Sequence, residues 1–168
     1  VEITGNTHPE AVLTSNLEMK ETPVIDPITG DFTLYVKATA KGYTPFELVA
    51  SLEDKEDSIL DLVIERSLDE REYTSTAWAA VYDELKQFPN LHNGIAFAFT
   101  GTVTEINATG TKYTIVVDIA AEGQPEQLIQ VDYWGQFSFT MGQKIRVFGN
   151  FWGSKNGLPY ILAPYIYR

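Results

Sequence analysis

Hydrophobic and polar residues alternate with a period of two over most of the second half of the chain. Short turn sequences interrupt this alternation at regular intervals. The alternating runs are residues 95–106, 112–120, 128–135, 143–153 and 158–168. A period of two places one face of a strand in a core and the other face toward water. Five such strands, with no long helix among them, predict a small antiparallel barrel or sandwich.

Two glycines, Gly101 and Gly149, lie inside these predicted strands. A strand in a five-stranded barrel has to bend sharply for the sheet to close, and glycine permits a bulge or a close approach of two backbones. We therefore expect Gly149 to be the bend within MGQKIRVFGNFWG (141–153). The residues expected to fill the barrel from this strand are Ile145, Val147 and Phe151. Asn156-Gly157 predicts a two-residue hairpin turn, because both residues tolerate a positive φ.

A helical spacing of apolar residues precedes the first of these strands. Within residues 67–90 the positions that follow an i, i+3, i+4 pattern are Ala77, Ala80, Val81, Glu84 and Leu85. Asp69, Glu70 and Glu72 lie ahead of this pattern, where the helix dipole favours negative charge. Pro89 ends it. The pattern predicts one helix with its body at about 75–87.

The N-terminal third has weaker patterns. Residues 1–23 show no sustained periodicity and are interpreted as a flexible arm. A turn at 26–31 is followed by a predicted half-buried strand, whose inward residues are Phe32, Leu34 and Val36. Thr44 and Pro45 form a good helix start, so a short helix is expected at 44–57. Residues 58–68 fit a strand or a helix, and we expect a strand.

Composition narrows the classes of protein that fit. The 168 residues include no cysteine, which excludes disulfides, thiolate metal sites and a cysteine nucleophile. The net charge is −11, and all of the excess acid lies in residues 1–90, whereas residues 91–168 carry five acidic and five basic residues. An acidic chain repels phosphate backbones, so the sequence argues against nucleic acid as a partner. No apolar run is long enough for a transmembrane helix. Because the chain begins with Val1, we expect that an upstream segment, such as a signal, a lipid anchor or a tag, has been removed.

Three motifs carry a resemblance to a known family. A Y-x-x-L-x-x-x-P pattern begins at Tyr82, and a G-x-x-x-x-F-x-G-x-V-x-x-I pattern begins at Gly94. A G-x-x-V-x-V-x-G pattern begins at Gly142, with Ile145 at its first valine position. Over residues 77–168 the chain resembles the OB-fold domain of Gram-positive secreted proteins and lipoproteins. The resemblance implies a five-stranded OB-like barrel preceded by a helix. Together with the patterns of the N-terminal third, the expected fold class is mainly β with α: this barrel and helix, plus a small α+β N-terminal region. The expected domains are the arm (1–23), the α+β region (24–74) and the helix plus barrel (75–168).

Candidate ligand-binding residues lie on and beside the predicted strands. OB-folds bind ligands on the face of their second and third strands, often by stacking on aromatic rings. Trp134 and Trp152 fall near predicted strand ends, where such a stacking platform would lie, although packing beneath the helix or the N-terminal region explains them better. The ligand-binding candidates are Tyr113, Asp132, Trp134, Phe137 and Trp152.

Catalytic motifs are absent from the sequence. No G-x-S-x-G, P-loop, G-x-G-x-x-G or H-E-x-x-H pattern occurs, and residues 53–57 (EDKED) lack the spacing of an EF-hand. We therefore expect no enzyme, no cofactor and no metal, and interpret the chain as an extracellular or cell-surface module that binds a protein, peptide or glycan. The alternatives are an OB domain for single-stranded nucleic acid or oligosaccharide, or a hydrolase that uses Asp118, Asp132 or His92.

Overall fold

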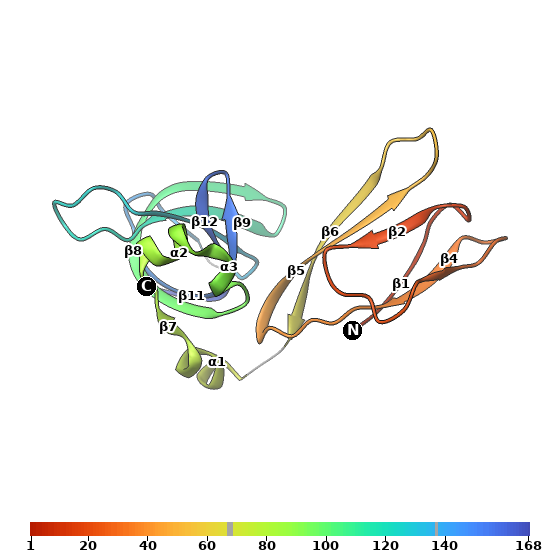
Figure 1. The fold of residues 1–168 in the computed structure, drawn as a ribbon. Helices are drawn as coiled ribbons and strands as arrows, with labels where there is room; N and C mark the ends of the chain where they lie inside the picture. Colours follow the sequence, from red (N-terminus) through yellow and green to blue (C-terminus); the bar gives the residue numbers. More distant parts are fainter. Residues whose placement is uncertain (67–68, 137) are drawn as a thin grey trace. The chain divides into compact units, whose positions relative to one another are not determined.

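The structure is a computed structural model that describes residues 1–66, 69–136 and 138–168. The chain forms two compact units. The first unit contains residues 1–39 and 45–64, and the second contains residues 40–44 and 65–168. Strands make up most of the regular structure in both units, and the helices are short (Figure 1). The predicted fold class, mainly β with some α, is therefore confirmed.

The first unit contains two three-stranded sheets. One sheet has the strand order β1-β4-β3, and the other has the order β2-β5-β6. These strands are β1 (Glu2–Asn6), β2 (Val12–Ser15), β3 (Val24–Ile25), β4 (Asp31–Tyr35), β5 (Gly42–Ser51) and β6 (Ser58–Arg66). Apolar side chains from both sheets share one core, which contains Leu13, Phe32, Leu34, Val36, Phe46 and Leu48. The predicted alternation at Phe32, Leu34 and Val36 is confirmed, as is a strand at 58–66.

Two expectations for this region are wrong. The segment 1–23 is not a loose arm, because β1 pairs with β4 and β2 pairs with β5. The segment 44–57 is not a helix, because β5 covers most of it and buries Phe46 and Leu48 on one face. The strands that pair with β1 and β2 lie far away in the sequence, so local patterns do not reveal them. The pairing of β5 with β2 outweighs the local helix-start signal at Thr44 and Pro45. The described residues of this unit form strands and no helix.

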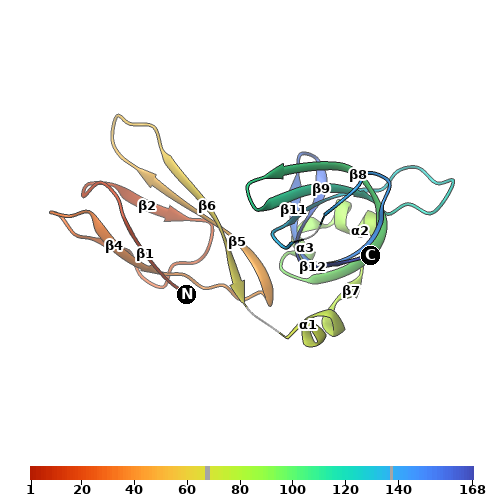
Figure 2. The same ribbon diagram turned by 180° about the vertical axis from the view of Figure 1, so that it is seen from behind.

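The second unit is built on a closed five-stranded barrel (Figures 1 and 2). Its strands are β8 (Ala96–Thr109), β9 (Lys112–Asp118), β10 (Leu128–Tyr133), β11 (Lys144–Lys155) and β12 (Leu158–Tyr167). Neighbouring strands follow the order β8-β9-β10-β12-β11, and β11 pairs with β8 to close the ring. Only β10 and β12 run parallel to each other among these five strands. All five strands agree with the predicted segments within a few residues.

Gly149 lies where β11 and β12 approach each other closely. Between the pairs Phe148–Tyr165 and Asn150–Leu162, β11 has one residue, Gly149, whereas β12 has two, Ala163 and Pro164, so the extra residue of the bulge lies in β12 opposite Gly149. A Cβ at Gly149 would approach Cγ2 of Ile161 and lie 2.7 Å from the carbonyl oxygen of Leu162. The backbones of β11 and β12 therefore approach each other so closely at Gly149 that any side chain there would displace backbone atoms of β12. This agrees with the close approach that a glycine inside a strand predicts, although the bulge itself lies in β12 rather than in β11.

The predicted continuous helix at 75–87 is wrong. The chain instead forms α1 (Glu70–Thr76), a two-residue strand β7 (Trp78–Ala79), α2 (Tyr82–Gln87) and α3 (Pro89–His92). β7 pairs with β8, and Leu85 on α2 enters the barrel core. In the last turn of α1, hydroxyl groups including that of Thr76 donate to carbonyl groups three or four residues earlier. Such bonds compete with helix continuation, and the pairing of β7 with β8 stabilises the break.

Asn150 connects four parts of the second unit through one fully buried side chain. Its Nδ2 donates to the carbonyl oxygens of Lys41 at 2.7 Å and Gly94 at 3.0 Å. Its Oδ1 accepts from the backbone N–H of Tyr43 at 3.0 Å and from the hydroxyl of Tyr73 at 2.8 Å. Burial raises the pKa of Tyr73, so its phenol keeps the proton that it donates. The segment 40–44 is thereby bound to β11.

Candidate functional site

The outward side of β10 carries polar residues that are nevertheless buried. Ile129, Val131 and Tyr133 point into the barrel core, so Gln130 and Asp132 point away from it. Exposed side chains are expected on that side, yet Gln130 is 3% and Asp132 is 1% exposed. A charged group this inaccessible on the outside of a barrel requires partners, because an unpaired buried carboxylate is strongly destabilising.

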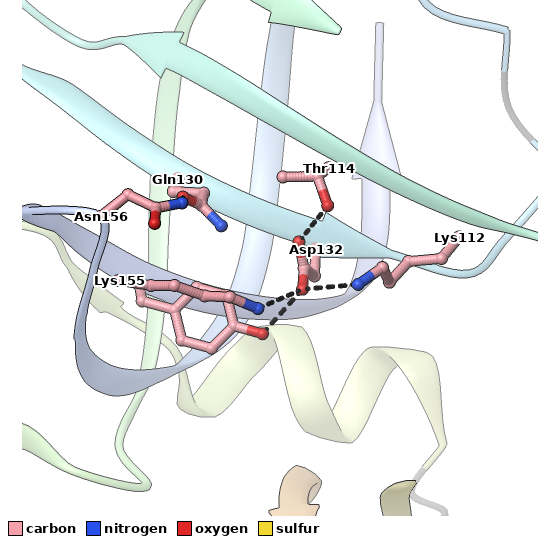
Figure 3. A network of polar contacts seen from close by, with 7 residues as sticks. Lys112, Thr114, Gln130, Asp132, Lys155 and Asn156 are labelled. Atoms are coloured by element: carbon pink, nitrogen blue, oxygen red, sulfur yellow. Dashed lines mark hydrogen bonds and ion pairs between the residues drawn. The ribbon is translucent and has the colours of Figure 1, made fainter. Parts of the chain in front are cut away.

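Four side chains surround the carboxylate of Asp132 (Figure 3). The hydroxyl of Thr114 donates to Oδ1 at 2.6 Å, and the hydroxyl of Tyr160 donates to Oδ2 at 2.8 Å. The ammonium groups of Lys112 and Lys155 lie 3.5 Å and 3.4 Å from the same Oδ2. We call Asp132 with these four residues the Asp132 network.

The contacts of Asp132 keep its carboxylate ionised. Burial alone would raise the pKa of Asp132. The hydrogen bonds from Thr114 and Tyr160, and then the charges of Lys155 and Lys112, outweigh burial and hold the pKa below its usual value. The carboxylate therefore acts as a fixed negative charge at neutral pH, with its acceptor positions occupied by protein donors.

Strand pairing explains how these residues meet. Thr114 lies directly opposite Asp132 on β9, and Tyr160 lies opposite Gln130 on β12. Lys155 comes from the end of β11 beside the hairpin turn, where Asn156 donates to Oε1 of Gln130 at 3.0 Å (Figure 3). Lys155 also lies 4.7 Å from the centre of the Tyr160 ring. Four strands thus contribute to one polar face of the barrel.

The structure places three other predicted candidates, Tyr113, Trp134 and Trp152, outside this network. Trp152 donates from Nε1 to the carbonyl oxygen of Tyr43 at 2.9 Å. Trp134 packs edge-on against the ring of the same Tyr43, with the ring centres 5.9 Å apart. Tyr113 packs against the barrel core and the ring of Phe139. Phe137 lies outside the described residues. Of the four predicted candidates that the structure describes, Asp132 is the one that belongs to the Asp132 network.

Asp118 and Asp132, both named above as possible hydrolase residues, do not form a carboxylate pair. Asp118 lies opposite Leu128 in the register of β9 and β10, whereas Asp132 lies opposite Thr114. Asp118 instead accepts the backbone N–H groups of Ala120 and Gln127, both at 2.9 Å. Within residues 1–66, 69–136 and 138–168, no three histidine, aspartate or glutamate side chains gather as a metal site would require.

Sequence reasoning missed the partners of Asp132. Lys112 and Thr114 lie on β9, which was predicted correctly. The alternation along this strand predicts that both side chains point away from the barrel core. Tyr160 reaches Asp132 only because β10 and β12 pair in parallel, and a pattern of alternation does not reveal which strands are neighbours. Lys155 belongs to the predicted hairpin, which has the expected positive φ values of 54° at Asn156 and 79° at Gly157.

Comparison with known proteins assigns no family. No protein-family model matches the sequence, and no curated protein matches it significantly. The resemblance to the OB-fold domain of Gram-positive secreted proteins over residues 77–168 therefore stays a prediction. Across the described parts of the chain, no helix combines the length and the hydrophobicity needed to cross a membrane.

Proposed function

We propose that this chain is a non-catalytic binding module that works outside the cell or at the cell surface. Its ligand, a protein, peptide or glycan, would lie on the outer face of β9, β10 and β12. The observation that carries this proposal is the Asp132 network. A face that only has to be soluble in water needs no buried carboxylate, because exposed polar side chains provide solubility without a desolvation cost.

The arrangement of the network supports binding because it fixes side chains that a ligand could contact. Lys112 and Lys155 are 34% and 44% exposed, so both are within reach of a molecule outside the barrel. Their contacts with Asp132 restrict them in advance, which lowers the entropy lost when a ligand orders them. The β9–β10 face is also the place where OB-type barrels commonly bind oligonucleotides and oligosaccharides.

Several features favour binding over catalysis. Asp132 is surrounded by donors and has a lowered pKa, which suits neither a general acid nor a strong base. His92 lies edge-on to Phe97 and Phe151, and its buried Nδ1 has no hydrogen-bond partner among the described residues. A catalytic histidine needs a partner that orients it. A cavity of about 250 Å³ elsewhere on the barrel has one titratable side chain in its lining, which is formed by Leu85, Lys86, Pro89, Ser154, Gly157 and Pro159.

One observation favours a second candidate, an OB domain for single-stranded nucleic acid or oligosaccharide. Lys112, Lys155 and Tyr160 place two cations beside an aromatic ring, and such a combination serves the binding of single strands in OB barrels. Asp132 offsets one of the two charges, and the chain as a whole carries a charge of −11. A peptide or glycan is therefore preferred over a polyphosphate.

The test is an array of glycans, peptides and single-stranded oligonucleotides, probed with three forms of the full chain. The first form is unmodified, and the second carries Lys112→Ala with Tyr160→Ala on the proposed face. The third carries Lys144→Ala, which removes an exposed lysine from β11 outside the network. Binding that the second form loses and the third keeps supports the proposal. Equal binding by all three forms would refute the site, and cleavage of the bound molecule would favour a hydrolase.

The proposed location needs its own measurement. Brief proteolysis of intact cells that express the full-length protein should degrade it while a cytosolic marker survives. Complete protection until the cells are lysed would contradict an extracellular or cell-surface module.

A further inference from the structure

We propose that Lys112 and Lys155 together form a subsite for a single anionic group of the ligand, either a carboxylate or a phosphate. This inference rests on the proposed function, because it names the chemistry recognised on the same face. It is carried by the convergence of the two ammonium groups on one buried oxygen atom, Oδ2 of Asp132.

The geometry brings two cations to one place from different strands. Lys112 lies at the start of β9 and Lys155 at the end of β11. Their Nζ atoms are 3.5 Å and 3.4 Å from Oδ2 of Asp132, so both ammonium groups surround the same point. An ammonium group has three N–H donors, and a single contact with Oδ2 occupies one of them. The partly exposed side chains can direct further donors toward a group outside the barrel.

The charges in the Asp132 network do not cancel. Two ammonium groups face one carboxylate, which leaves an excess of one positive charge. Thr114 and Tyr160 add hydroxyl donors that stabilise the carboxylate and contribute no charge. One further anionic group would bring the net charge of the Asp132 network to zero. Residues 91–168 have no net charge, so the acid that dominates the whole chain does not come from this part.

Asp132 acts in this site as a positioning residue. Its carboxylate is 1% exposed, which leaves almost no surface for a ligand to contact. Because two hydroxyl groups fix it, it holds both lysines at defined positions before a ligand arrives. Lys155 is restricted further by the face of the Tyr160 ring, 4.7 Å from its Nζ. Two lysines fixed in this way suit one compact anion better than an extended chain of phosphates.

The experiment is an NMR titration of the ¹⁵N-labelled full chain with inorganic phosphate and, separately, with D-glucuronate. Sodium chloride keeps the ionic strength constant and provides the control anion. We expect saturable shifts of the backbone amides of 112–114 and 155–156, with a midpoint in the millimolar range. Shifts with phosphate alone would identify a phosphate-bearing ligand, and shifts with glucuronate alone would identify a carboxylate-bearing one.

Two variants decide whether the lysines are responsible. Lys112→Gln with Lys155→Gln should weaken anion binding at least tenfold, whereas Lys144→Gln should leave it unchanged. An unaltered amide spectrum away from the site will show that both variants fold. If chloride produces the same shifts, or if the double variant binds as well as the unmodified chain, the inference is wrong.

The outcomes also separate this inference from the proposed function. An uncharged array ligand that binds the face while neither anion shifts the amides would overturn the anion subsite and leave the binding module intact. Anion binding at the two lysines, combined with an array ligand insensitive to Lys112→Ala and Tyr160→Ala, would support the subsite and refute the proposed function.

Discussion

Replacing Gly149 by valine tests whether the barrel depends on the close approach of β11 to the bulge in β12. A Cβ at this position would press against the Ile161 side chain and lie 2.7 Å from the carbonyl oxygen of Leu162 and 3.0 Å from Cα of Ala163. The last two are backbone atoms of β12. They cannot move aside without disturbing the pairing that holds β12 between β10 and β11.

The expected destabilisation follows from two opposing terms. Inserting carbon atoms into a packed core costs about 1–3 kcal/mol. Removing a glycine recovers about 0.4–1 kcal/mol, because the unfolded chain becomes less flexible. Gly149→Ala should therefore lower the free energy of unfolding by about 1–2 kcal/mol. Valine adds two further carbon atoms at the same crowded point, so Gly149→Val should lower it by about 2–4 kcal/mol.

Urea unfolding followed by tryptophan fluorescence will measure this effect. The three tryptophans are Trp78, Trp134 and Trp152, and all of them belong to the second unit, so the signal reports on the barrel. With a denaturant slope of about 2 kcal/mol per molar urea, Gly149→Val should lower the unfolding midpoint by roughly 1–2 M.

Gly153→Ala provides the control. Gly153 has a φ of +76°, and a Cβ there would meet only Oδ1 of Asn93 at 3.8 Å. Alanine at 153 should therefore cost about 1–2 kcal/mol through backbone strain alone, without a clash. Equal midpoints for Gly149→Val and the unmodified chain would refute the reasoning and would place the essential bend elsewhere, with Gly101 as the next candidate.

Three further outcomes are expected. Asn150→Asp should destabilise the barrel by about 3 kcal/mol or more, because a carboxylate would then face two carbonyl oxygens; a urea midpoint within 0.2 M or so of the unmodified chain would contradict this. The lowered pKa of Asp132 means that its carboxylate stabilises the fold above the unfolded-state pKa of about 3.9, and that this stabilisation is lost as the pH falls through the folded pKa. In thermal melts, Asp132→Asn should therefore be less stable than the unmodified chain at pH 7, and this difference should shrink below about pH 4; a constant difference would count against the network. Phe46→Ala should cost about 3–5 kcal/mol, because the ring is 1% exposed in the core of the first unit. Far-UV circular dichroism during urea unfolding will detect this loss, and an unchanged curve would argue against that core.

The barrel could be predicted from the sequence because each of its strands has a clear alternating pattern of its own. A period of two sustained over five segments, with turns at Asn156-Gly157 and elsewhere, leaves few alternatives to a small β structure. Gly149 could be predicted for a similar reason, since a glycine within an otherwise alternating strand usually marks a bulge or a close approach.

Elements that depend on distant partners could not be predicted in this way. β1 and β2 are short, and they are strands because β4 and β5 lie beside them. The helical spacing at 75–87 was real, yet β7 breaks the helix by pairing with β8. The same limit applies to the candidate site. The sequence placed Asp132 on the outward side of its strand, but its burial depends on side chains from three other strands.

The contacts of Asn150 affect the order in which parts of the second unit can fold during synthesis. The backbone N–H of Tyr43 donates to Oδ1 of Asn150, which lies 107 residues further along the sequence. During synthesis the segment 40–44 leaves the ribosome long before β11 exists, so this part of the second unit has to be completed late, through contacts that are among the least local in the chain. A fragment that starts at residue 65 would lack the segment altogether and would leave Nδ2 and Oδ1 of Asn150 each one partner short. Shortened versions of this protein should therefore retain residues 40–44.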